Sequence, residues 1–302
     1  MKRKLAKSLR PGLGGHVYRF GCNNLSTVGI FARLPRCFFE GKTIVAKWNL
    51  DAIRAQFPAF QREQNGEPVG YFDGPAGSQV PLRVADAVSR YLLTTNANRG
   101  APFATSQESD ALLEQAHRTL ADFLGTNDPE CIAFGPNMTT LTLALSRALG
   151  RTWQTGDEII VTQLDHDANV TPWVLAARDA GAVVHQVPVR AEDCTLDLEA
   201  FHNRLSEKTR LVAVGYASNA TGTVNPVAEM ITAAHNVGAE VFVDAVHLAP
   251  HRLIDVSSLD CDYLAASAYK FFGPHVGLMY GKREKLEALP AYKLRPSPNS
   301  LP

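Results

Sequence analysis

From residue 131 onward, short apolar runs alternate with longer segments whose apolar residues recur at helical spacing. There are seven such runs: CIAF at 131, EIIVT at 158, AVVHQVPV at 182, RLVAVGY at 210, EVFVDAV at 240, DYLAASA at 262 and VGLMYG at 276. Strands that alternate with helices build parallel sheets covered by helices on both faces, so these strands are apolar along most of their length. The sequence therefore predicts a three-layer α/β fold around a mostly parallel, seven-stranded sheet.

Three of the helical segments are predicted to stop at a glycine. DALLEQAHRTLADFLG ends at Gly125, TLTLALSRALG at Gly150 and AEMITAAHNVG at Gly238. Glycine is favoured just past a helix because it takes the left-handed conformation without a steric penalty. The sequence has neither GxGxxG after a strand nor GxxxxGK[ST], so nucleotide binding of the usual kinds loses its main support.

Composition narrows the class of protein. A chain of 302 residues with 45% hydrophobic content can bury a large domain and part of a smaller one. Its net charge of zero gives no argument for a nucleic-acid or membrane partner, and no run approaches the roughly 18 apolar residues of a membrane helix. Five cysteines form no CxxC or Cys/His cluster, which favours reduced thiols in a cytoplasmic protein without a metal site.

Residues 1–46 differ from the rest because they are rich in Lys and Arg and contain one acidic residue, Glu40. An unstructured extension or a misplaced start codon is the preferred interpretation, and an organelle transit peptide is the alternative. We expect an N-terminal segment over residues 47–75 and the large domain over residues 76–290.

Polar side chains follow five of the predicted strands, at the edge of the sheet where ligands of open α/β sheets bind. They are Asn137, Met138, Thr139 and Thr140 at a helix start, His166, Ser218 with Asn219, Asp244 with His247, and Ser267 with Tyr269 and Lys270. Each has an ordinary explanation alone, such as a helix cap for the threonines or a solvated side chain for the lysine. Their shared position makes a binding site the better interpretation.

This combination matches the needs of pyridoxal 5′-phosphate. Its aldehyde requires a lysine amine for a Schiff base, which Lys270 could supply from a partly desolvated site. Its ring nitrogen requires a carboxylate, and Asp244 could serve. His166 could stack on the ring and Asn219 could donate to the ring 3′ oxygen. The phosphate could bind the loop at 137–139, whose helix start presents backbone N–H groups, and also Ser267.

These residues resemble the class V aminotransferase family of fold-type I pyridoxal enzymes, in its cysteine desulfurase and selenocysteine lyase branch. The motifs that carry the resemblance are YFDGPAGSQVP (71–81), NRGAPFATSQES (98–109), LDHDANVTPW (164–173), SNATGTVNP (218–226) and VDAVHLAPHRLIDVSSLDCDYLAASAYKFFGPHVGLMYGK (243–282). The resemblance implies a homodimeric enzyme, a transferase or lyase acting on an amino acid. It implies Lys270 as the Schiff-base lysine, Asp244 as the partner of the ring nitrogen and His166 as the stacking residue and possible acid or base.

The resemblance also implies Asn219 near the 3′ oxygen and phosphate contacts from the loop at 137–139 and from Ser267. Desulfurases commonly read EHHAN, DGAQ and SGHK where this chain has DHDAN, DAVH and SAYK. His247 thus stands where a glutamine near the ring oxygen is expected. Tyr269 stands where a phosphate-contacting histidine is expected.

Relatives continue beyond residues 291–302, which would be a linker, into a smaller domain with a substrate-binding arginine and, in desulfurases, a nucleophilic cysteine. None of the five cysteines here matches that nucleophile. Three functions remain open: a desulfurase-like lyase or aminotransferase, a class V racemase or epimerase, and a truncated, non-catalytic protein with the cofactor fold.

Overall fold

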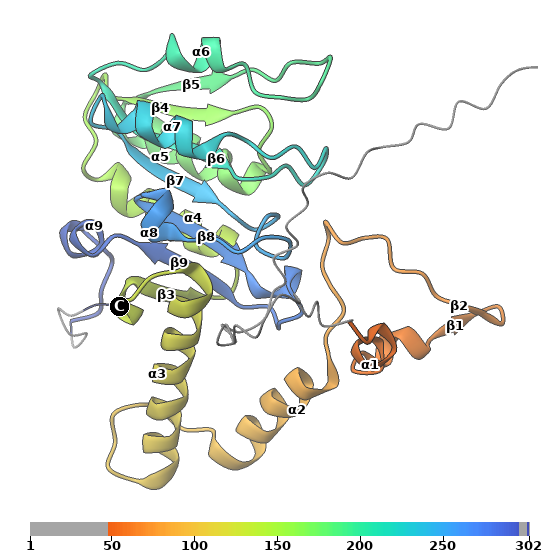
Figure 1. Cartoon of the computed structure of the whole chain (residues 1–302). Coiled ribbons are helices and arrows are strands. Elements are labelled where there is room, and N and C mark those ends of the chain that lie inside the picture. Colours follow the sequence, from red (N-terminus) through yellow and green to blue (C-terminus); the bar gives the residue numbers. More distant parts are fainter. Residues whose placement is uncertain (1–47, 296–300, 302) are drawn as a thin grey trace, which may run out of the picture.

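The computed structural model describes residues 48–295 and 301 (Figure 1). All seven predicted strands form one sheet, which confirms the fold class. In chain order they are β3 (Ile132–Gly135), β4 (Glu158–Thr162), β5 (Val183–Val187), β6 (Thr209–Gly215), β7 (Glu240–Asp244), β8 (Tyr263–Ser267) and β9 (Gly277–Gly281). The basic extension predicted over residues 1–46 lies outside the described residues.

The sheet has the strand order β3-β9-β8-β7-β6-β4-β5. The pairs among β8, β7, β6, β4 and β5 are parallel, whereas β9 runs antiparallel to both β8 and β3. Because β9 is reversed between them, β3 points in the same direction as β8. The carboxyl ends of all strands except β9 therefore meet at one edge of the sheet.

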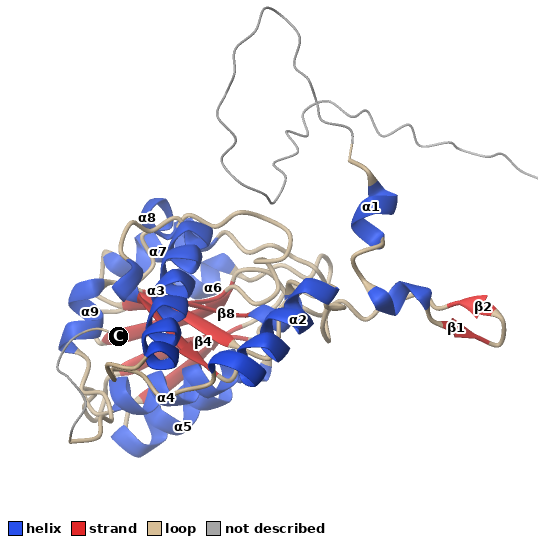
Figure 2. Cartoon of the chain, turned by 90° about the horizontal axis from the view of Figure 1, so that it is seen from below, coloured by secondary structure: helices blue, strands red, loops and turns tan. Residues whose placement is uncertain are grey.

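Two layers of helices cover the sheet: α3 (Ala104–Leu124), α6 (Leu198–His202), α7 (Val227–His235) and α8 (Val256–Leu259) on one face, α4 (Met138–Gly150) and α5 (Thr171–Ala180) on the other (Figure 2). Successive residues of a strand point to opposite faces. Ile159 accordingly joins the core under α4 and α5, and Ile160 joins the core under α7. This pattern explains why the strands are apolar on both sides.

The part of the chain before α3 projects away from the sheet (Figure 1). It contains α1 (Leu50–Arg54), the two-residue strands β1 (Glu63–Gln64) and β2 (Glu67–Pro68), α2 (Leu82–Arg90) and a π-helical turn at Tyr91–Thr95. None of the helices in this part contains a buried residue. A short last helix, α9 (Arg283–Ala288), follows β9. In the described part of the chain, no helix is long and apolar enough to cross a membrane.

Two of the three predicted helix-ending glycines have left-handed backbones, with φ of 75° at Gly125 and 80° at Gly238. The prediction for Gly150 is wrong, because this residue is the last residue of α4 and the cap is Arg151 with ordinary helical angles. A Cβ at Gly150 would stand 3.2 Å from the Cβ of Ala176. Gly150 therefore serves the close approach of α4 to α5.

Candidate active site

A cavity of about 210 Å³ opens at the carboxyl edge of the sheet. Its walls come from the ends of β6, β7 and β8, the start of α4, the loop after β4 and the segment at 75–76. All predicted site residues except Asn137 and Thr140 line it: Met138, Thr139, His166, Ser218, Asn219, Asp244, His247, Ser267, Tyr269 and Lys270. The topology thus brings together side chains that are distant in sequence, as parallel strands do at their carboxyl ends.

Lys270 follows β8 in a short 3₁₀ turn and reaches into the cavity half-buried. Burial lowers the pKa of its amine, and attraction to Asp244 opposes that effect. The amine donates a hydrogen bond to the carbonyl of Pro75 and lies 5.0 Å from the centre of the Tyr269 ring. A lysine with a lowered pKa reaches its nucleophilic neutral form more easily.

The segment around Ser78 clamps the turn that carries Lys270. The Ser78 amide and hydroxyl both donate to the carbonyl of Tyr269, at 2.9 and 3.1 Å. The Ser78 hydroxyl in turn accepts from the amide of Phe272 at 2.7 Å. The YFDGPAGSQVP motif at 71–81 therefore fixes the backbone on both sides of the lysine.

Asp244 ends β7 and is buried. Desolvation raises the pKa of its carboxyl to about 6, opposed by the Val246 amide, which donates to it at 2.9 Å, and by the charge of Lys270. A pKa of about 6 still leaves this carboxylate mostly ionised at neutral pH. Asp244 can therefore hold a cationic ring nitrogen.

The start of α4 presents donors to the cavity. The Met138 amide donates to the Ser267 hydroxyl at 2.9 Å, and the Asn137 side chain accepts from the Thr140 amide at 2.9 Å. Asn137 is thus a helix cap, which explains why it does not line the cavity. Ser267 retains its own O–H, and the exposed Thr139 adds an amide and a hydroxyl beside it, a donor set suited to an anion at a helix start.

His166 lies in the loop after β4. Its Nδ1 accepts a hydrogen bond from the Ala168 amide at 3.0 Å, which assigns the proton to Nε2 in the neutral ring. Asn219 follows β6, next to the buried Ser218, whose hydroxyl accepts from the Ala220 amide at 3.2 Å. The structure thus brings His166 and Asn219 to the same cavity from two different strands.

His247 and Tyr269 contact aromatic neighbours at the cavity. Burial lowers the pKa of His247, and the charges of His251 and Lys270 add to this effect. The His247 and His251 rings meet edge to face with centroids 5.8 Å apart. Tyr269 stacks on His275 at 4.4 Å, which holds its ring beside the lysine.

Sequence reasoning missed several residues of the cavity wall, among them Pro75, Asp165 and Asn225. Asn225 is buried and donates to the Gly215 carbonyl at 2.7 Å, while its own side-chain oxygen has no partner among the described residues. Pro75 reaches the cavity through a long-range contact that no local pattern encodes. Asp165 had a signal, since it is a carboxyl next to His166 directly after a buried strand.

The structure describes three of the five cysteines as free thiols. Cys131 and Cys261 are buried, and desolvation raises the pKa of both thiols to about 12. Cys194 is a half-buried loop residue. None of the three lines the cavity, while Cys22 and Cys37 lie outside the described residues. Within the described ranges, no group of three or more His, Cys, Asp or Glu side chains could hold a metal ion.

The sheet, its helical layers and the lysine at the carboxyl edge define the large domain of a fold-type I pyridoxal enzyme. A family model described as Aminotransferase class-V matches residues 70–295. The chain belongs to the class V aminotransferase family.

Relatives and solved structures agree with this family. The chain is 36% identical over 253 residues to a cysteine desulfurase of Dickeya dadantii, covering 82% of this chain and 61% of that one. It is 38% identical to a probable cysteine desulfurase of Vibrio cholerae, covering 81% and 61%. A cysteine desulfurase structure from Escherichia coli superposes with a TM-score of 0.69 at 32% identity, covering 80% and 60%. The chain thus spans about 60% of the length of these relatives.

Proposed function

We propose that this chain is the cofactor-binding domain of a pyridoxal-phosphate enzyme that acts on an amino acid, as a cysteine desulfurase-like lyase or a class V aminotransferase. The observation that carries the proposal is the shared cavity of Lys270 and Asp244, in which the amine and the buried carboxyl attract each other. The family and the cysteine desulfurases among its relatives support it.

The donor set fits the proposed cofactor. Lys270 would bind the aldehyde, Asp244 would hold a proton at the ring nitrogen, and the start of α4 with Ser267 would bind the phosphate. When bound, pyridoxal phosphate supplies an electron sink for negative charge at the substrate Cα.

The chain's own residues would then orient the ring and move protons. Asp244 fixes the position of the ring nitrogen because it ends a buried strand. The Lys270 amine lines the cavity with a lowered pKa, and it would take the proton from the substrate Cα. His166, with its proton on Nε2, can stack on the ring or act as a second acid, and His247 can reach the 3′ oxygen side.

The proposal is tested by the absorbance spectrum of the purified protein with pyridoxal phosphate, followed by borohydride reduction and peptide mapping. We expect a visible band and a single reduced adduct on Lys270, both lost in Lys270→Ala. The matched control is Lys285→Ala, because Lys285 is a half-buried lysine that pairs with Glu240 at 2.8 Å and does not line the cavity. Adducts spread over surface lysines would contradict the proposal.

The substrate class is tested separately. Cysteine is the first amino acid to try, because the similar proteins are called cysteine desulfurases. With an added dithiol as the two-electron reductant, a desulfurase-like lyase should convert cysteine to alanine and release its sulfur as sulfide. Formation of a keto acid without sulfide would instead favour an aminotransferase.

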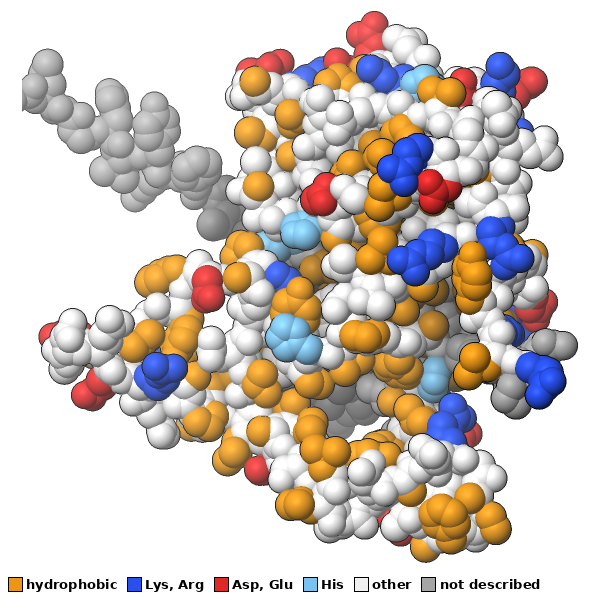
Figure 3. Space-filling model, turned by 180° about the vertical axis from the view of Figure 1, so that it is seen from behind, with side chains coloured by type: hydrophobic (Ala, Val, Ile, Leu, Met, Phe, Trp, Pro, Cys, Tyr) orange, Lys and Arg blue, Asp and Glu red, His pale blue; other side chains and the backbone are white. Residues whose placement is uncertain are grey.

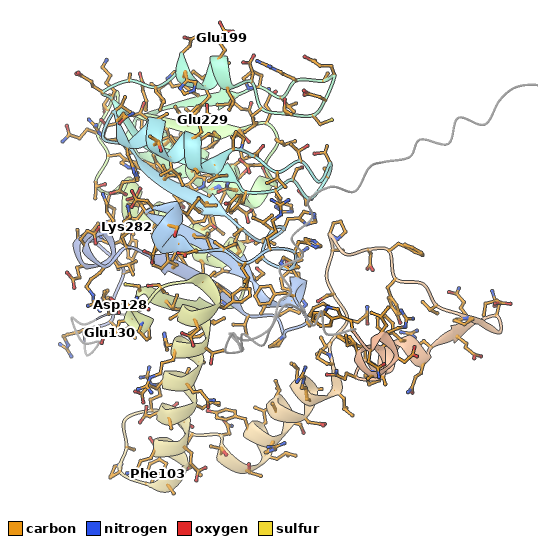
Figure 4. The ribbon with its side chains drawn as sticks, in the orientation of Figure 1. Phe103, Asp128, Glu130, Glu199, Glu229 and Lys282 are labelled. Atoms are coloured by element: carbon orange, nitrogen blue, oxygen red, sulfur yellow. The ribbon has the colours of Figure 1, made fainter. Side chains whose placement is uncertain are left out.

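We also infer that two copies of the chain associate through the projecting part before α3. Large hydrophobic side chains are exposed along it and in the first half of α3: Leu82, Val88, Leu92, Leu93 and Phe103 before α3, and Leu112 within it. Figure 3 shows hydrophobic surface over this part, and Phe103 lies at the end of α3 that is distant from the sheet (Figure 4). An apolar surface of this kind is typical of an interface.

Sedimentation analysis tests this inference. Leu93, which is 81% exposed, should support a dimer that Leu93→Asp weakens. Leu253→Asp is the control, since Leu253 is exposed at 55% outside this part. A wild-type monomer at high concentration would refute the inference.

The cytoplasm is the proposed compartment. Cys131, Cys194 and Cys261 are free thiols in the structure, which fits a reducing environment. Fractionation of cells that express the natural gene would test this location.

A further inference from the structure

A second carboxyl, Asp165, stands next to Asp244 in the cavity wall. The Asp165 Oδ1 atom occupies the space that a Cβ on Gly215 would fill. Gly215 is the register partner of Asp244 across β6 and β7. Side chains of register partners in neighbouring strands point to the same face of a sheet, so Asp165 takes the place of a side chain beside Asp244.

The surroundings of Asp165 are defined by few groups. Its Oδ2 accepts from the Thr162 hydroxyl at 2.7 Å, and the Asn169 side chain and the Gly215 backbone also favour the ionised carboxyl. Asp165 is partly accessible because it lines the cavity, but it lies deep in the fold. Desolvation therefore raises its pKa to about 7, the Asp244 charge adds to this, and the hydrogen bonds oppose it.

The other ionisable groups at the cavity differ in their effect on the two carboxyls. Lys270 attracts the charge of Asp244 and is not among the groups that shift Asp165. His166 is the next residue in the chain, and His247 also lines the cavity. A pair of close carboxyls resists double ionisation, so one proton stays on the member without a cation. That member is Asp165.

We propose that Asp165 is a positioning residue for Asp244: it retains the proton of this carboxyl pair and thereby leaves the negative charge on Asp244, where the cofactor ring nitrogen would bind. This proposal rests on the proposed function for its link to the cofactor. The carboxyl pair and the proton that it retains are properties of the chain without any ligand.

The first experiment uses the protein without cofactor and measures the melting temperature from about pH 5 to about pH 9. A carboxyl whose folded pKa is raised stabilises the fold at low pH, and this stabilisation is lost as the pH rises through the folded pKa. We expect the wild-type melting temperature to fall as the pH rises toward about 7. Asp165→Asn should lack most of this fall, and Asp179→Asn, which changes an exposed acid on α5, should keep it.

A second variant keeps the test valid even if Asp165→Asn destabilises the fold for other reasons. Thr162→Val removes the hydroxyl that favours the ionised carboxyl while nearly keeping the shape of a fully buried side chain. The fall in melting temperature should therefore move to higher pH in Thr162→Val. The proton assignment would be overturned if the melting temperatures of wild type and Asp165→Asn depended on pH in the same way. It would also be overturned if the fall in melting temperature of Thr162→Val occurred at the same pH as in wild type.

The link to the cofactor is tested by the visible absorbance of the pyridoxal-phosphate-loaded protein against pH. We expect the visible absorbance of the wild-type protein to change near pH 7 and that of Asp165→Asn to stay constant there. Identical profiles would overturn the link, even if the protein without cofactor behaves as expected. If the proposed function itself is wrong, no reduced adduct will form on Lys270. The melting temperatures measured without cofactor still test the carboxyl pair in that case.

Discussion

Replacing Ser78 with Ala should loosen the turn that carries Lys270. The Ser78 hydroxyl donates to the Tyr269 carbonyl at 3.1 Å and accepts from the Phe272 amide at 2.7 Å. The substitution removes both bonds and leaves the backbone bond from the Ser78 amide in place. The projecting N-terminal part would then hold the lysine turn by fewer contacts.

The expected cost follows from the number and exposure of these bonds. The net contribution of a hydrogen bond to stability is about 1 kcal/mol, and the exposed Phe272 amide can form a hydrogen bond with water once the Ser78 hydroxyl is removed. We therefore expect Ser78→Ala to lower the free energy of unfolding by about 1–2 kcal/mol. If the same energy holds Lys270 in place, pyridoxal phosphate affinity should fall roughly five- to thirtyfold, since about 1.4 kcal/mol corresponds to a factor of ten.

Urea unfolding and cofactor titration by absorbance measure the two quantities. Ser257→Ala is the matched control, because Ser257 makes one exposed hydrogen bond, to the Gly125 carbonyl at 2.9 Å, and does not line the cavity. The control should lose less stability and keep its cofactor affinity. Unchanged affinity in Ser78→Ala, despite the loss of stability, would refute the idea that this clamp positions Lys270.

Two further predictions concern the rest of the fold. Gly125→Ala should lower the free energy of unfolding by about 2 kcal/mol or more, because a side chain at this left-handed position is strained and its Cβ would stand 2.8 Å from the Asp255 Cα; urea unfolding measures the loss. Iodoacetamide followed by peptide mapping should label Cys194 in the native protein, whereas Cys131 and Cys261 should react only after unfolding, because burial raises the pKa of both thiols.

The sheet could be predicted because each strand is a short apolar run, and burial on both faces leaves that pattern in the sequence. The projecting part could not be predicted in the same way. Its helices bury no residue, so the apolar residues of α2 do not show where this helix lies relative to the sheet. Gly150 was misread because the same residue type serves a helix end and a close helix contact, and only the packing against Ala176 separates the two.

The site was predictable wherever its residues directly follow a strand. Asp244 and Lys270 are placed by strand ends, so the rule for open α/β sheets locates them. Pro75 and Ser78 reach the lysine turn from nearly two hundred residues away, and such contacts depend on tertiary structure alone. Asn137 was expected near the cofactor because it directly precedes α4, and the structure shows that its side chain caps this helix.

The place of β9 between β3 and β8 has a consequence for the order of folding. Ile132 of β3 pairs with Tyr280 of β9, the last strand of the sheet along the chain, and β3 has no other strand neighbour among the described residues. On the ribosome, β3 must therefore wait for its hydrogen-bond partners until almost the whole domain has been synthesised. Such distant pairing is slow to form, and α4, which follows β3, is anchored late as well. The end of the cavity at the start of α4 should therefore be the last part to fold.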